Sequence, residues 1–190
     1  AAWLLVAVSL IGGFGFVWLA GNLQAASAAM LTWVLYVGVY TPLKRVTPLN
    51  TAVGAVAGAL PIAIGWLAAD GPQQVLAGDI AATLAVAALG TVLYLWQFPH
   101  FMAIAWLYRK QYDLAGLKML TVTDPSGLRA AGQSLAAALA MIPVSLAMAI
   151  PSGSIRMFLT AALASTVYVL VSANFAFRRD DRSARILLFT

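Results

Sequence analysis

The chain has 190 residues, of which 63% are hydrophobic and only 9% charged, with a formal net charge of +5 and no cysteine. A soluble domain has about a quarter of its residues charged, so this composition excludes an ordinary soluble protein. The lack of cysteine excludes disulfides and thiolate metal sites. Because the basic residues lie between apolar runs rather than on one soluble face, we expect the chain to meet a lipid bilayer and no nucleic acid.

Long uncharged runs predict an all-α fold, a polytopic transmembrane helix bundle that forms a single domain over residues 1–190. In chain order, the expected spans cover residues 3–20, 23–40, 49–68, 80–107, 130–150 and 157–177, and a seventh starts at residues 186–190. Pro143 is expected to interrupt the fifth of these spans.

The connections between these spans hold most of the charged residues. We expect a first charged loop at residues 41–48, an acidic loop at 70–79 and a mixed-charge loop at 178–182. Thr47, followed by Pro48, is expected to be the N-cap of the third span. Small or special residues at a spacing of three to four give that span a face for close helix packing in lipid, namely Asn50, Gly54, Gly58, Pro61 and Gly65.

Lys and Arg are divided unevenly between the two sides of the predicted bundle. The loops after the second, fourth and sixth spans hold ten of them, whereas the opposite side holds only Arg156. Basic loops remain on the inner side of a membrane. We therefore expect these loops in the cytoplasm or the mitochondrial matrix, and the alanine-rich sequence favours a bacterial plasma membrane over a mitochondrial inner membrane.

A first candidate site follows the second span. Tyr36, Tyr40 and Lys44 are four residues apart, so a helix would place them on one face. Lys44 and Arg45 then precede the N-terminus of the third span, where free N–H groups favour an anion. The pattern indicates a phosphate or diphosphate site, and the alternative is a basic membrane anchor without a ligand.

A second candidate site lies on the fourth span. Gln97, His100, Tyr108 and Gln111 share one helical face if the helix continues past residue 109, although apolar Ile104 divides that face. His100 would lie about 13 Å below the surface. At that depth it either hydrogen-bonds Gln97 or a tyrosine, or serves as a ligand or catalytic group.

Aromatic residues on the second, third and fourth spans could line a cavity for an isoprenoid chain or a flat macrocycle and stabilise an allylic cation. Aromatic residues also gather at membrane interfaces without such a role. Carboxylates for a metal are scarce, since the chain has no Glu. The aromatic residues concerned are Trp33, Tyr36, Tyr40, Trp66, Tyr94, Trp96, Phe98 and Phe101.

The chain carries a series of further motifs. They are YTPLKR at residues 40–45, Asn50 with GAVAGALP at 54–61, Gly65-Trp66, WQFPHF at 96–101, and Tyr112, Gly116 and Met119 followed by VTDP at 122–125. In this order they resemble the heme O synthase family, which belongs to the UbiA-type intramembrane prenyltransferases. The resemblance covers nearly the whole chain, and YTPLKR and WQFPHF are highly specific.

The resemblance implies a nine-helix bundle that transfers a farnesyl group from farnesyl diphosphate to a vinyl group of heme B, forming heme O for terminal oxidases. It implies Mg²⁺ bridging the diphosphate to aspartates, and heme A synthase or oxidase assembly factors as partners. The implied catalytic residues are Lys44, Arg45, Asn50 and Tyr40. The implied substrate-binding residues are His100, Gln97, Trp96, Tyr112, Gln111 and Lys118, and Asp113 is the candidate metal ligand.

Two departures from the family pattern limit what this chain could do alone. The first aspartate-rich motif of the family would precede Ala1, so we expect an inactive fragment that lacks the N-terminal helices and the end of the last helix. The family has an acidic residue before the tyrosine of its second motif, where this chain has Gln111. Two alternatives therefore stay open: a related transferase acting on a quinone precursor or chlorophyllide, and a non-catalytic bundle that binds heme or isoprenoid.

Overall fold

The computed structural model describes residues 2–190, with side chains from Leu4 onward. Helices are its regular elements, and no strand occurs within that range. The all-α prediction is therefore confirmed. The long helices are α1 (Ala2–Ala20), α2 (Leu23–Trp33), α4 (Asn50–Ala68), α6 (Ile80–Leu107), α9 (Leu128–Ala149) and α10 (Ile155–Arg178). The short ones are η1 (Val34–Tyr40), α3 (Thr41–Leu43), α5 (Gly71–Leu76), α7 (Arg109–Leu114), α8 (Leu120–Thr123) and α11 (Asp181–Phe189).

Five helical segments are long and apolar enough to cross a membrane, judged by length and composition. Within the described side chains, α1 contributes a shorter apolar helix, Leu4–Ala20. The expected first span includes Trp3, whose side chain lies outside the described residues. The five segments are Leu23–Leu43, Asn50–Ala68, Ile80–Leu107, Leu128–Ala149 and Ile155–Arg178.

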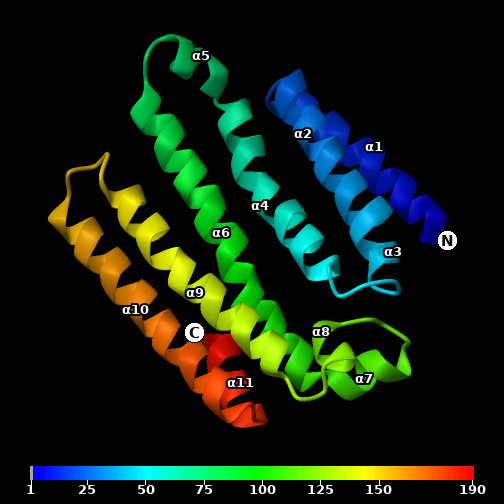
Figure 1. The fold of residues 1–190 in the computed structure, drawn as a ribbon. Helices are drawn as coiled ribbons and strands as arrows, with labels where there is room; N and C mark the ends of the chain where they lie inside the picture. The colour runs from blue at the N-terminus through cyan, green and yellow to red at the C-terminus, as the bar shows by residue number, and fades with distance from the viewer. Residues whose placement is uncertain (1) are drawn as a thin grey trace.

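Each long helix packs against the next one in the chain, from α1 through α10 (Figure 1). The last helix, α11, packs against both α6 and α10, so it closes a small bundle with α9. The side chains between these four helices form the main hydrophobic core. Its large members are Met102, Trp106, Met141, Tyr168, Phe175 and Leu187.

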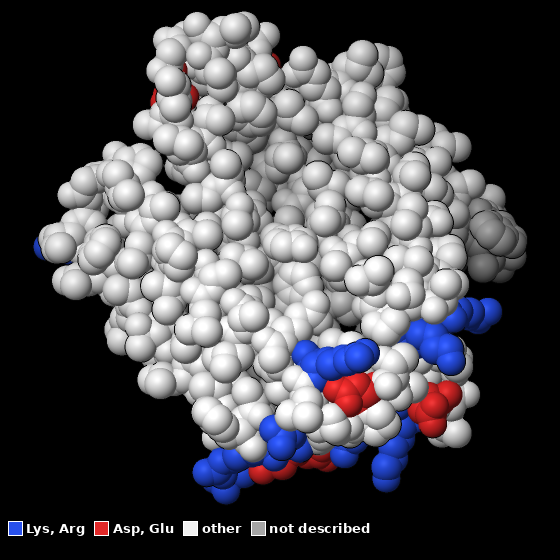
Figure 2. Space-filling model, viewed as in Figure 1, with Lys and Arg blue, Asp and Glu red and all other residues white. Residues whose placement is uncertain are grey.

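The charged connections lie together at one end of the bundle. The α3–α4 loop, the α7–α8 segment and the α10–α11 turn are at the lower end in Figure 1, and α5 and the α9–α10 turn are at the upper end. Figure 2 shows Lys and Arg gathered at the lower end, below a surface that is almost free of charge. We call this end the basic end.

The second span is helical from Leu23 to Leu43, but it changes winding on the way. Residues Val34–Tyr40 form a π-helix, in which the Thr41 backbone N–H donates to the Tyr36 carbonyl. Pro42 has no N–H to continue an ordinary α-helical ladder at this point. Short π segments within helices are frequent at functional sites.

Three expected boundaries were wrong. Residues 71–76 form helix α5 rather than loop, and Pro72 lies in its first turn, where a missing N–H costs nothing. The third span begins at Asn50 with Leu49 as its N-cap, so Thr47 and Pro48 belong to the preceding turn. The seventh helix begins at Asp181 and not at residue 186.

The start of α11 has a local cause. Asp180 accepts a hydrogen bond from the Ser183 backbone N–H, and the Ser183 hydroxyl pairs with the Asp180 backbone. This reciprocal capping box makes a helix N-terminus favourable within a charged segment. Helix α9 also differs from expectation, since it runs through Pro143 without a break. Packing against both α6 and α10 holds it together there.

Candidate functional site

The first candidate site has the geometry expected from its spacing. The Tyr36 and Tyr40 rings lie 5.1 Å apart, and the Lys44 Nζ lies 4.2 Å above the Tyr40 ring centroid. Tyr40 packs on Gly54 of α4, where a Cβ atom would overlap the ring. The aromatic pair therefore holds the Lys44 ammonium at the basic end, near the membrane surface. Burial lowers the pKa of Lys44 below its ordinary value.

Asn50 and Lys118 join this lysine to a distant segment. The Lys118 backbone N–H donates to the Lys44 carbonyl at 2.6 Å. Asn50 is fully buried, and its Nδ2 donates to the carbonyls of Thr47 at 2.7 Å and Lys118 at 3.2 Å. Because both donors of this amide are engaged, Asn50 fixes the two segments against each other. The side chains of Arg45 and Lys118 are exposed.

The segment that carries Gln111, Tyr112 and Asp113 follows a break in the helix of the fourth span. Helix α6 ends at Leu107, and Tyr108 has φ −105° and ψ 18°, after which α7 starts in a new direction. The helix therefore does not continue past residue 109, which was the condition for one helical face from Gln97 to Gln111. Gln111 and Asp113 are exposed, whereas Tyr112 is half-buried. Burial and the neighbouring Tyr108 raise the pKa of Tyr112.

Within the membrane-spanning part of α6, Gln97 and His100 have different surroundings. Gln97 is 5% exposed and donates from Nε2 to the carbonyls of Ala55 at 3.0 Å and Leu93 at 3.1 Å. Gln97 thus joins α6 to α4. His100 is half-buried and stacks on Trp96 at 4.7 Å and 23°. Among the described residues it has no hydrogen-bond partner, so this structure does not contain the bond to Gln97 or a tyrosine that was one of the two alternatives for His100.

Two of the apolar hollows along α6 are lined by its aromatic residues. A groove of about 770 Å³ between α6, α9 and α10 is lined in part by Trp96, Tyr168 and Ser145. A smaller hollow of about 270 Å³ between α4 and α6 is lined in part by Tyr94 and Trp66. Two of the predicted aromatic residues, Tyr94 and Trp96, therefore line different hollows along α6. The larger hollow has the size of a pocket for a small organic ligand.

The described carboxylates do not form a metal site. No group of three or more His, Asp or Glu side chains lies close together among the described residues. Asp124 accepts hydrogen bonds from Ser126 and from the Arg129 backbone, and these lower its pKa. These bonds place Asp124 in the turn between α8 and α9. Asp180 caps α11, and Asp181 pairs with Arg109, which leaves Asp113 exposed beside Tyr112.

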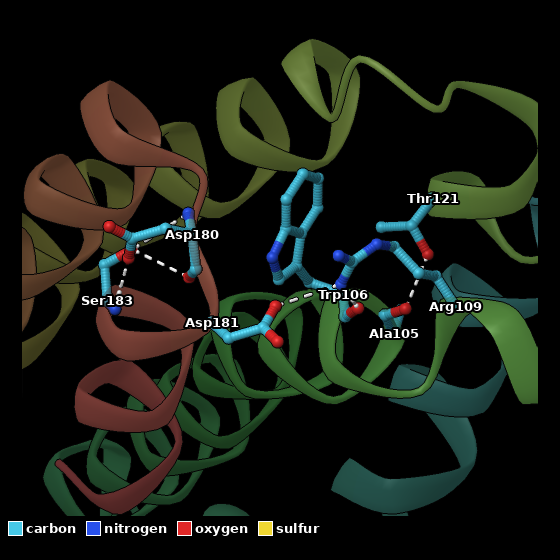
Figure 3. A network of polar contacts seen from close by, with 7 residues as sticks. All are labelled: Ala105, Trp106, Arg109, Thr121, Asp180, Asp181 and Ser183. Atoms are coloured by element: carbon cyan, nitrogen blue, oxygen red, sulfur yellow. Dashed lines mark hydrogen bonds and ion pairs between the residues drawn. The ribbon is translucent and has the colours of Figure 1, made fainter.

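A polar network at the basic end was not predicted from the sequence (Figure 3). Arg109 Nη1 donates to the Trp106 carbonyl at 2.5 Å and pairs with Asp181 Oδ1 at 3.1 Å. The Thr121 hydroxyl donates to the Ala105 carbonyl at 2.7 Å. These contacts join α6, α7, α8 and α11, and the pair of Arg109 and Asp181 spans 72 positions in the sequence. From the sequence, residues 178–182 were expected only to form a mixed-charge loop.

Comparison with known proteins defines the family. The profile of the UbiA prenyltransferase family matches residues 1–190. The chain belongs to this family. It is 41% identical to a protein named protoheme IX farnesyltransferase from Rhodopirellula baltica, over 97% of this chain and 64% of the relative. A protein of the same name from Solibacter usitatus is 40% identical, over 95% of this chain and 59% of the relative.

Similar proteins include a mitochondrial one. A human protein named mitochondrial protoheme IX farnesyltransferase is 36% identical over 94% of this chain and 38% of its own length. The chain thus spans less than two thirds of the length of each of these three relatives. No solved structure matches it.

Proposed function

We propose that this chain forms the larger part of a membrane prenyltransferase that joins a farnesyl group to heme B. The names of the similar proteins, which state a farnesyl transfer to protoheme IX, support this substrate pair. The observation that carries the proposal is the Lys44 ammonium, held over Tyr40 beside the segment that contains Tyr112 and Lys118. This arrangement offers positive charge to a diphosphate at the depth of the membrane surface.

In the proposed reaction, the bond between the first farnesyl carbon and the diphosphate oxygen breaks, and diphosphate leaves with both bonding electrons. A vinyl carbon of the heme forms the new carbon–carbon bond. Water adds its oxygen to the other vinyl carbon and releases a proton, which gives the hydroxyethylfarnesyl group of heme O. Charge develops on the leaving diphosphate, so fixed cations there lower the barrier most.

The residues of this chain have distinct parts in that step. Lys44 and the exposed Arg45 and Lys118 attract and hold the diphosphate. Tyr40 supports the Lys44 ammonium through its ring face. Asn50 keeps the Lys44 turn and the Lys118 segment together, because its amide bonds the backbone of both segments.

Magnesium is part of the proposal only as a partner of the diphosphate. A magnesium ion commonly uses one or two carboxylates together with substrate phosphates. Asp113 is exposed at the basic end and could supply one of these. The described residues alone do not assemble a complete site, so the mechanism above relies on the side-chain cations.

The heme is proposed to lie against the face of α6 formed by Trp96 and His100. The two rings stack on each other, Trp96 is 37% exposed and also lines the large groove, and His100 lacks a hydrogen-bond partner among the described residues. An imidazole with an available nitrogen can ligate heme iron. The basic end is proposed to face the cytoplasm or the mitochondrial matrix.

Replacing Lys44 tests this proposal. In the full-length protein, Lys44→Ala should abolish prenylated heme, because the leaving diphosphate loses its most fixed cation, while insertion into membranes stays normal. Product is measured by mass analysis of hemes extracted from membranes supplied with heme B and farnesyl diphosphate. Lys110→Ala is the matched control, because Lys110 is an exposed lysine at the same end. Equal product from Lys44→Ala and Lys110→Ala would remove Lys44 from the site.

A further inference from the structure

Arg109 occupies a special place at the end of α6. It is the first residue of α7, immediately after the break at Tyr108, so its backbone sets the direction of the segment that carries Gln111, Tyr112 and Asp113. The last carbonyls of a helix lack partners within the helix. The Arg109 guanidinium supplies one such partner, since it donates to the Trp106 carbonyl.

The same Nη1 atom also pairs with Asp181 at 3.1 Å, and the guanidinium stacks 4.5 Å from the Trp106 ring (Figure 3). Trp106 is 7% exposed and packs edge-on against Phe175 of α10, so it forms a fixed platform. Asp181 is held in the first turn of α11. Arg109 therefore bridges α6 and α7 to α11, and its charge is already paired.

The segment after Arg109 is held at two further points. The Thr121 hydroxyl donates to the Ala105 carbonyl, and the Lys118 backbone bonds the Lys44 carbonyl and the Asn50 amide. Residues 109–121 thus form an arch with one end at Arg109, the other at Thr121, and a contact with the Lys44 turn between them. A change at one end of the arch would move Tyr112 relative to Lys44.

We propose that Arg109 is a positioning residue, which acts through Trp106 and Asp181 to hold the arch of residues 109–121 over the diphosphate site. This inference rests on the proposed function for its substrate. It differs from a direct role in binding, because the contacts of the Arg109 guanidinium lie within the protein itself: Nη1 bonds the Trp106 carbonyl and Asp181, and the guanidinium lies over the Trp106 ring.

The test compares Arg109→Ala and Asp181→Asn with Lys110→Ala in the full-length protein in membranes. Lys110 is the matched control, because it is the adjacent basic residue, is exposed, and has no hydrogen bond or ion pair among the described side chains. Misplacement of reacting groups by about 1 Å can cost on the order of a hundredfold in rate. We expect Arg109→Ala to lower kcat by about ten- to a hundredfold, with a smaller change in KM for farnesyl diphosphate.

Asp181→Asn should lower kcat in the same direction and by less, since the carbonyl bond and the ring stacking remain. Arg109→Lys should restore only part of the activity, because an ammonium lacks the planar fork that stacks and bonds at once. A rise in KM at unchanged kcat in Arg109→Ala would overturn the inference in favour of direct binding. Kinetics equal to those of Lys110→Ala would also overturn it.

Amide hydrogen exchange gives a readout that needs no activity. Exchange within residues 109–119 should become faster in Arg109→Ala than in wild type or Lys110→Ala, while α9 keeps its protection. Unchanged exchange in this segment would contradict the positioning role. If the wild-type protein makes no prenylated heme, the proposed function fails, and the exchange result alone decides whether Arg109 holds the arch.

Discussion

Lys44 combines a charge with partial burial, and this combination has a consequence for pH dependence. Removal from water disfavours the ammonium form, so the pKa of Lys44 lies below its ordinary value of 10.5. The neutral amine accumulates once the pH exceeds that lowered pKa, and a neutral amine no longer attracts a diphosphate. Affinity for farnesyl diphosphate should therefore be constant at lower pH and weaken as the pH rises through the pKa of Lys44.

The comparison with Lys44→Arg isolates this residue, because arginine stays protonated at all accessible pH values. We expect KM for farnesyl diphosphate to rise on the alkaline side in wild type, and to do so at higher pH or not at all in Lys44→Arg. The measurement is KM as a function of pH for both proteins. Identical alkaline profiles would show that another group controls diphosphate binding.

At the scale of single residues, the sequence predicted contacts between residues close in the chain and missed contacts between distant ones. The cluster of Tyr36, Tyr40 and Lys44 follows from a spacing of four residues, which survives the change to a π-helix. The pair of Arg109 and Asp181 joins residues 72 positions apart, and no sequence period indicates such a contact. The bond from the Asn50 amide to the Lys118 carbonyl, 68 positions away, was not predictable for the same reason.

Helices α4 and α6 pack through a glycine that the small-residue face of α4 correctly indicated. A Cβ atom on Gly58 would overlap the side-chain amide of Gln97, whereas a Cβ atom on Gly65 would meet nothing within 4 Å. Gln97 cannot move freely, because it bonds the carbonyls of Ala55 and Leu93. Gly58 therefore offers a test position, and Gly65 a matched control, within one helix.

Gly58→Ala should destabilise the protein by about 1 to 3 kcal/mol, the usual cost of overpacking. Gly65→Ala should be neutral, or stabilising by up to about 1 kcal/mol through helix propensity. Thermal unfolding of both variants in the same detergent measures the difference. Equal melting temperatures for the two variants would mean that α4 and α6 do not approach each other at Gly58.

Element boundaries were predictable where composition changes sharply. The expected fourth span, residues 80–107, coincides with α6, because Asp79 and Arg109 bracket an uncharged run. The start of α11 was missed, because its capping box lies among charged residues that resemble a loop. Whether the helix continues past residue 109 stayed open from the sequence, since the polar residues on both sides of Tyr108 fit a continuous helical period.

At the scale of the whole molecule, the two ends of the bundle differ in charge, and this difference predicts topology. The chain has no cysteine, so single cysteines can report which side of a membrane they face. Cysteines at the exposed positions Lys110 and Gln73, which lie at opposite ends of the bundle, should react with a membrane-impermeant maleimide from opposite sides. In intact bacterial cells we expect labelling at Gln73 and none at Lys110. The reverse pattern would contradict a cytoplasmic basic end.

The most direct test of the account is the reaction itself. The full-length protein, in membranes with heme B, farnesyl diphosphate and Mg²⁺, should yield a heme heavier by one farnesyl group plus one hydroxyl group, as measured by mass analysis after extraction. Such a product, absent from membranes that lack the protein, would establish farnesyl transfer to heme and show that Gln111 is compatible with catalysis. Folded protein that converts no heme under these conditions would contradict the proposed function.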